Sequence, residues 1–139
     1  MKPLRILLAT NNYGVQVREV PLANELATAF AREGHHVQVV ATSWSSPPWA
    51  PPRRYREESG VEVLFLTPRQ LGRHGTAMWR LTKWLATPTS SYRAVRKELA
   101  GQEFDLMVAL APAVASGGAI VWGAKRSPKR LLWIPGFFP

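Results

Sequence analysis

The sequence predicts an α/β fold, a Rossmann-like doubly wound parallel sheet, and two observations indicate it. First, short apolar runs alternate with stretches of helical periodicity along the 139 residues, a pattern that favours parallel strands joined by right-handed crossovers. Second, the first apolar run leads directly into a polar, glycine-containing turn, Asn11 to Gly14, and then into a helical stretch and another apolar run. We expect five strands in the order 3-2-1-4-5.

The expected strands cover residues 4–9, 37–41, 61–66, 104–110 and 130–134. The first is almost continuously apolar, as in strands that helices cover on both faces. A first helix should run from Pro21 to Gly34, because proline suits the first turn and glycine the end.

Later helices are expected over residues 71–86 (one helix or two short pieces), 89–100, with Pro88 at its start, and 114–124. The prolines of residues 43–56 exclude a regular helix or a central strand, so we expect a long irregular loop there.

Composition excludes several classes of function. The chain has no cysteine, which rules out disulfides, zinc thiolates and thiol catalysis. No apolar run reaches the about 20 residues that span a bilayer. The N-terminus resembles a signal peptide only superficially, because its apolar run is too short and no small-residue cleavage site follows. We therefore expect a cytoplasmic protein.

The net charge of +9 is concentrated in one stretch. The stretch from Arg53 to Lys97 contains ten basic residues and only three acidic ones, all glutamates. Four of the six tryptophans lie in or beside this stretch. Such a field attracts phosphate, whether on a nucleotide, a nucleic acid or a lipid headgroup. No nucleic-acid-binding motif accompanies it, so we expect no nucleic-acid partner.

Residues 71–86 combine apolar and basic side chains. A basic amphipathic helix can lie in a membrane interface, although the same pattern also suits a domain helix with an apolar inner face. The residues expected to contact a membrane or another anion are Arg53, Arg54, Arg80, Lys83, Trp79 and Trp84.

A ligand is expected outside the carboxyl ends of the strands, where the winding of the sheet reverses. Asn11, Asn12, Tyr13 and Gly14 should therefore lie beside Pro112. The dinucleotide fingerprint and the P-loop are both absent, which argues against the usual NAD binding and against nucleotide hydrolysis.

No residue is assigned to catalysis or to a metal. No serine, histidine and acid form a nucleophilic set, and the three histidines lack metal-ligand spacing. His35 and His36 precede the second strand, so they should lie at the opposite edge of the sheet. The glycines 117 and 118 open a helix, and we favour close packing over anion binding as their role.

Several strings resemble the N-terminal domain of glycosyltransferase family 4, and the resemblance covers essentially the whole chain. They are RILLATNNYG, PLANELATAFAREGHHVQVVAT, SGVEVLFL, SYRAVRKEL, FDLMVALAP and RLLWIPGFFP. The most specific part runs from Leu22 to Val39.

The resemblance implies a GT-B fold, in which two Rossmann-like domains hold a nucleotide-sugar donor and an acceptor in the cleft between them. Residues 1–139 would be the acceptor-side domain, without the donor-binding domain. The implied activity is that of a hexosyltransferase acting on a cell-envelope polysaccharide or a lipid-linked acceptor at the inner face of the membrane. It would require the second domain, and the nucleotide sugar would be its substrate, with no cofactor. Gly136 joins Pro112 and the turn after the first strand as an expected substrate contact.

The sequence departs from the family pattern in three places. Gly14 is followed by Val15 rather than a second glycine, Ala109 to Pro112 contain no histidine, and Gly136 stands where relatives have an acid. Either an acid or a histidine could serve as general base, so their absence puts inverting chemistry in doubt. A retaining mechanism is affected less, because the donor phosphate can assist the acceptor. The alternative is a non-catalytic Rossmann-like subunit that pairs with a separate donor-binding chain.

Overall fold

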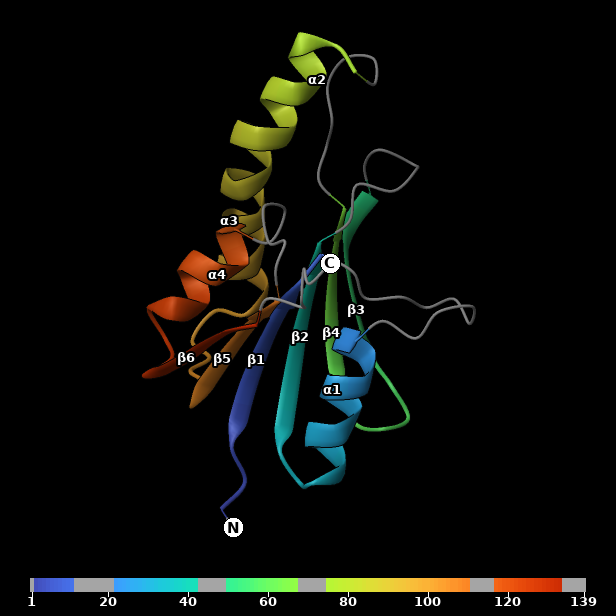
Figure 1. Ribbon diagram of the computed structural model, residues 1–139, viewed down its shortest axis with the longest axis vertical. Helices are drawn as coiled ribbons and strands as arrows, with labels where there is room; N and C mark the ends of the chain where they lie inside the picture. Colours follow the sequence, from blue (N-terminus) through green and yellow to red (C-terminus); the bar gives the residue numbers. More distant parts are fainter. Residues whose placement is uncertain (1, 12–21, 43–49, 68–74, 111–116, 134–139) are drawn as a thin grey trace, which may run out of the picture.

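The computed structural model describes residues 2–11, 22–42, 50–67, 75–110 and 117–133, and within them six strands form one sheet. The strands are β1 (Arg5–Thr10), β2 (His36–Thr42), β3 (Ala50–Arg56), β4 (Glu62–Thr67), β5 (Leu106–Leu110) and β6 (Lys129–Trp133). Their order is β3-β4-β2-β1-β5-β6, shown in Figure 1. The neighbouring pairs among β4, β2, β1, β5 and β6 are all parallel, which confirms the expected 3-2-1-4-5 order for these five.

The sixth strand, β3, corrects the expectation of an irregular loop over residues 43–56 in its second half, residues 50–56, whereas residues 43–49 lie outside the described residues. β3 pairs antiparallel with β4, and its register shifts between Ala50 and Arg53. Pro51 and Pro52 lie in this shifted part. Proline lacks an N–H for a central ladder but is compatible with an edge strand or a bulge. The prolines therefore exclude a central strand, as expected, but they are compatible with an edge strand, which is the position of β3 in the sheet.

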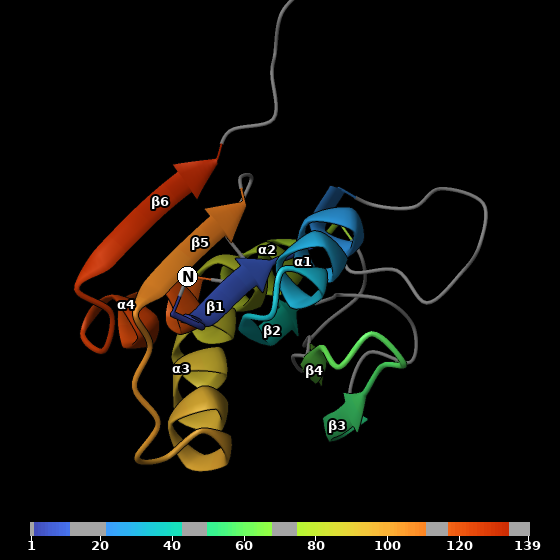
Figure 2. The ribbon, with the colours of Figure 1, turned by 90° about the horizontal axis from the view of Figure 1, so that it is seen from below.

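Two hydrophobic clusters, one on each face of the sheet, form the core. On one face α1 (Leu22–Arg32) buries Ala23 and Ala27 against β1 and β2. On the other face α3 (Thr87–Glu98) and α4 (Gly117–Ala124) bury Val95 and Trp122. Figure 2 shows α1 on one side of the strands and α3 and α4 on the other. β1 supplies Leu8 to the first cluster and Leu7 to the second, as a strand with alternating side chains must.

Glycines allow α4 to approach its neighbours closely. A Cβ atom on Gly118 would lie 2.2 Å from the carbonyl oxygen of Pro88 and 2.4 Å from the backbone nitrogen of Tyr92. A Cβ atom on Gly123 would lie 2.4 Å from the side chain of Leu7. The packing role favoured for the start of this helix is therefore confirmed for Gly118, which touches the α3 backbone.

The described part of residues 71–86 forms two short helical pieces, one of the two arrangements expected there. α2 (Ala77–Leu81) and the π-helical turn η1 (Thr82–Ala86) lead into α3 without a break. The helix expected to start at Pro88 is confirmed as α3, whose first turn contains Pro88, where a missing N–H is tolerated. Its direct continuation from η1 was not expected. A π turn directly precedes α3, and Thr89 Oγ1 donates to the Leu85 carbonyl at 3.4 Å.

Candidate functional site

The carboxyl ends of the five parallel strands lie in a row along one edge of the sheet. Thr10 pairs in register with Ala41, Thr42 with Leu66, and Ala9 with Ala109. Leu110 at the end of β5 pairs with Trp133 at the end of β6. Ligands of open α/β sheets bind outside this edge, so it is the candidate site.

Three of these strands, β1, β2 and β4, end in a threonine, and the sequence analysis did not identify this. Thr10 and Thr42 are only 3% and 1% exposed, and Thr67 is half-buried. The Thr42 hydroxyl is buried without a hydrogen-bond partner in the described part of the chain. A threonine at the end of three of the five apolar runs was the signal that could have revealed this row of hydroxyls.

Of the residues expected to contact substrate, the structure describes only Asn11. It directly follows β1 at the carboxyl edge and is half-buried. Asn12, Tyr13, Gly14, Pro112 and Gly136 lie outside the described residues. The strand ends that precede their segments, those of β1, β5 and β6, are adjacent on the one edge.

The expected anion-binding residues lie on two different elements. Arg80, Trp79 and Trp84 belong to α2 and η1, where Arg80 and Trp84 are exposed and Trp79 is half-buried. Lys83 lies on η1, and its side chain is outside what the structure describes. Arg53 and Arg54 lie instead on β3, so the structure does not gather the set on one element.

The two β3 arginines have structural contacts of their own. The guanidinium of Arg53 lies 5.5 Å from the ring centres of both Tyr55 and Phe65, and Arg54 Nη1 donates to the Glu98 carbonyl at 3.2 Å. Tyr55 packs against the first cluster. Burial, reinforced by the Glu57 carboxylate and opposed by Arg53, raises the pKa of the Tyr55 hydroxyl above its ordinary 10.0. These contacts hold β3 to the sheet.

The opposite, amino edge has an open hollow of about 610 Å³, lined by charged and polar groups. Several of them are already paired. Arg56 forms an ion pair with Glu62, Arg5 donates to Gln102 Oε1 at 3.3 Å, and His35 Nδ1 accepts from the Leu4 N–H at 3.0 Å.

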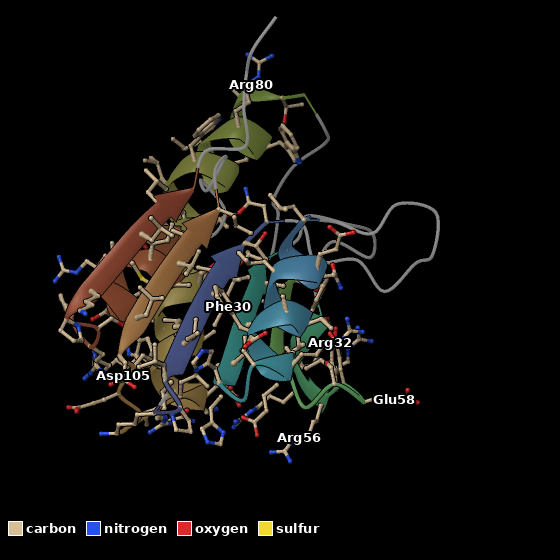
Figure 3. The ribbon with its side chains drawn as sticks, turned by 60° about the horizontal axis from the view of Figure 1, so that its bottom comes forward. Phe30, Arg32, Arg56, Glu58, Arg80 and Asp105 are labelled. Atoms are coloured by element: carbon tan, nitrogen blue, oxygen red, sulfur yellow. The ribbon has the colours of Figure 1, made fainter. Side chains whose placement is uncertain are left out.

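His35 and His36 thus lie at the amino edge, as expected. Figure 3 shows Arg56 and Asp105 toward this edge and Arg80 at the other end of the molecule.

Within the described ranges, no group of three or more histidine, aspartate and glutamate side chains is placed to hold a metal ion. None of the helices in these ranges is both long and apolar enough to cross a bilayer.

Comparison with known proteins identifies the fold. No protein-family model and no curated protein matches the chain. Among solved structures, the crystal structure of CalG4, the calicheamicin glycosyltransferase, matches 95% of this chain with a TM-score of 0.58 and 21% sequence identity. The match covers 33% of the CalG4 chain, so the present chain spans about a third of that protein. At this identity the likeness establishes the fold alone, that of a Rossmann-like half of a GT-B fold, and does not single out family 4.

Proposed function

We propose that this chain is the acceptor-side half of a GT-B glycosyltransferase of the family 4 type. In the complete enzyme a hexose would pass from a nucleotide sugar to a cell-envelope polysaccharide or lipid-linked acceptor on the cytoplasmic side of the membrane. The observation that carries this proposal is the structural match to a glycosyltransferase over 95% of the chain. The family 4 assignment depends on the order and spacing of the sequence strings given above.

The chemistry of the carboxyl edge suits positioning of a sugar better than proton transfer. Threonine hydroxyls and an asparagine amide can donate to and accept from the hydroxyl groups of a sugar. None of the described residues that end the five parallel strands is a histidine or carboxylate, and the acid in the first turn of α1, Glu25, is exposed. A retaining mechanism, in which the donor phosphate assists the acceptor, agrees with this inventory.

The role of Thr42 follows from its unpaired hydroxyl. A buried hydroxyl without a partner is unfavourable by about 1–3 kcal/mol, and a bound sugar or its phosphate would relieve that penalty. In a GT-B enzyme one domain supplies only one wall of the cleft. A single half should therefore present an open edge at its carboxyl ends rather than an enclosed pocket.

An NMR titration tests the acceptor-side role. The ¹⁵N-labelled chain is titrated with a short-chain polyprenyl pyrophosphate-linked sugar and, separately, with UDP. We expect shifts at the amides of Thr10, Asn11 and Thr42 with the lipid-linked sugar and none with UDP. Shifts with UDP at this edge, or shifts with the acceptor confined to the amino edge, would contradict the proposal.

A pair of variants controls for nonspecific effects. Thr42→Val removes a buried, unpaired hydroxyl at the carboxyl edge. Ser127→Ala removes one that is equally buried (3% exposed) and unpaired among the described residues, but it lies just before β6, at the amino edge. We expect only Thr42→Val to weaken acceptor binding, by about threefold to thirtyfold.

The second candidate is a non-catalytic Rossmann-like subunit that docks onto a separate donor-binding chain. The absence of a histidine or carboxylate among the described strand ends of the carboxyl edge favours it. Mixing the chain with a donor-binding half and a labelled nucleotide sugar separates the two candidates. Transfer of label to the lipid-linked acceptor supports the enzyme, and a stable complex without transfer supports the binding subunit.

A further inference from the structure

The segment formed by α2 and η1, residues 77–86, is an apolar helical arm with little of its surface covered. Four large apolar side chains on it are more than half exposed: Met78 (56%), Leu81 (55%), Trp84 (56%) and Leu85 (64%). Burial begins only at Thr87 (0%), the first residue of α3. An exposed apolar patch of this kind marks a contact with a protein or a membrane.

The arm is capped at its start and joined to a packed helix at its end. Thr76 caps its start, since its hydroxyl Oγ1 accepts from the Trp79 N–H at 3.3 Å and its carbonyl accepts from the Arg80 N–H at 3.0 Å. At its other end it continues directly into α3, which packs on the sheet. The apolar residues are therefore presented on a preformed helix.

The charge around the arm identifies the occupant. Residues 63–97 contain no aspartate or glutamate and carry seven basic residues, Arg69, Arg73, Arg80, Lys83, Arg93, Arg96 and Lys97. Two of them, Arg80 and Lys83, lie on the arm itself. Anionic headgroups attract such a segment, each nearby lysine or arginine strengthening the attraction, while tryptophan favours the headgroup depth.

The position of the arm relates it to the candidate site. In Figure 1, α2 projects beyond the end of the sheet toward which the parallel strands point. Figure 3 shows Arg80 at that end, away from Arg56 and Asp105. A surface that binds the arm would therefore lie on the same side of the molecule as the carboxyl edge.

We propose that the arm lies in the interface of an anionic lipid membrane, with Met78, Leu81 and Leu85 among the acyl chains. Trp84 lies at headgroup depth, and Arg80 contacts lipid phosphates. Binding in this orientation turns the carboxyl edge toward the lipid surface, where a lipid-linked acceptor is found. The proposal goes beyond sugar transfer, since an arm of this composition binds membranes whatever reaction the site performs.

Vesicle co-sedimentation tests this without any transfer assay, so its failure is distinct from failure of the proposed function. The chain is mixed with phosphatidylglycerol-containing vesicles and with pure phosphatidylcholine vesicles at low and at high salt. We expect binding to the anionic vesicles that weakens with salt, and little binding to the neutral ones. A blue shift of tryptophan fluorescence that Trp84→Phe reduces should accompany it.

Matched variants locate the contact. Arg80→Glu should lower partitioning about tenfold or more, whereas Arg96→Glu makes the same charge change at the far end of α3 and should have a much smaller effect. Leu85→Asp should lower partitioning about tenfold or more, whereas Val121→Asp places the same change at a 52% exposed site on α4 and should have little effect. Circular dichroism verifies that each variant is folded.

Three results would overturn the proposal. The first is the absence of binding to anionic vesicles at low salt, which would favour a protein partner for the arm. The second is an equal loss of binding for Arg80→Glu and Arg96→Glu, which would indicate attraction by net charge alone. The third is unchanged binding for folded Leu85→Asp.

Discussion

On β1, Leu7 and Leu8 have no exposed surface, whereas on the arm Leu81 and Leu85 leave 55% and 64% of theirs exposed. Both pairs are leucines on regular elements of the same chain. In the sheet they contribute to the two clusters that stabilise the fold, at about 25 cal/mol for each Å² of apolar surface buried. On the arm most of this gain is absent. The apolar character of the arm is therefore not explained by stability of the chain alone.

The largest expected effect comes from replacing one leucine in the sheet and one on the arm. Leu8→Ala should lower the free energy of unfolding by about 2–5 kcal/mol, because it opens a cavity in the first cluster. Leu85→Ala should change it by less than about 0.5 kcal/mol, because an exposed position opens no cavity and alanine favours helix. Urea denaturation followed by circular dichroism measures both.

A comparable loss of stability in Leu85→Ala would contradict the contrast. It would mean that the arm packs on the rest of the chain in solution, and its apolar side chains would then need no external partner.

The second test concerns how closely α4 is held to α3. Gly118→Ala should cost about 1–3 kcal/mol, because the added methyl group meets backbone atoms that cannot rotate away. Gly117→Ala is the matched control, since its Cβ atom would meet only the Pro88 Cβ, at 3.8 Å, an ordinary contact. Alanine should leave stability unchanged there or raise it slightly. Equal effects at the two positions, measured by thermal unfolding, would show that α4 is not packed against the α3 backbone.

The contrast between the buried sheet and the exposed arm also separates what could be predicted from the sequence from what could not. The five parallel strands were predictable because strands buried on both faces, such as β1, show continuous apolar runs. β3 was not, because its pairing depends on β4, and Arg53 and Arg54 gain their contacts only once that edge forms. Helical periodicity indicated a helix over part of residues 71–86, but the same pattern also suits a helix that packs on a core. Its exposure could be learned only from the three-dimensional arrangement.

The candidate site was predictable in position and only partly in detail. Winding of the sheet fixes the carboxyl edge as the place for a ligand, and the register of β1, β5 and β6 agrees with it. The buried hydroxyls of Thr10 and Thr42 were missed because threonine is also an ordinary strand residue. Only burial without a partner distinguishes Thr42 from a packing residue.

The smallest expected effect is a change in the pH dependence of stability at Tyr55. It tests whether the packed core includes the edge strand β3. The Tyr55 hydroxyl is buried and has no hydrogen-bond partner within the described ranges, and burial raises its pKa above 10.0. The folded state therefore holds this proton more tightly than the unfolded chain does. Its contribution to stability is full below pH 10 and is lost as the pH rises from there through the higher pKa of the folded state.

Comparison with Tyr55→Phe isolates this contribution from the other groups that titrate at high pH. At pH 8 the variant should be about as stable as the parent, because it removes an unpaired hydroxyl and keeps the ring on the first cluster. Between pH 8 and pH 10.5 the parent should lose more stability than the variant, measured as the shift of the urea midpoint. Equal losses would mean that the Tyr55 hydroxyl is solvated in solution. The packed region would then end at β4, and the edge strand β3 would resemble the arm more than the sheet.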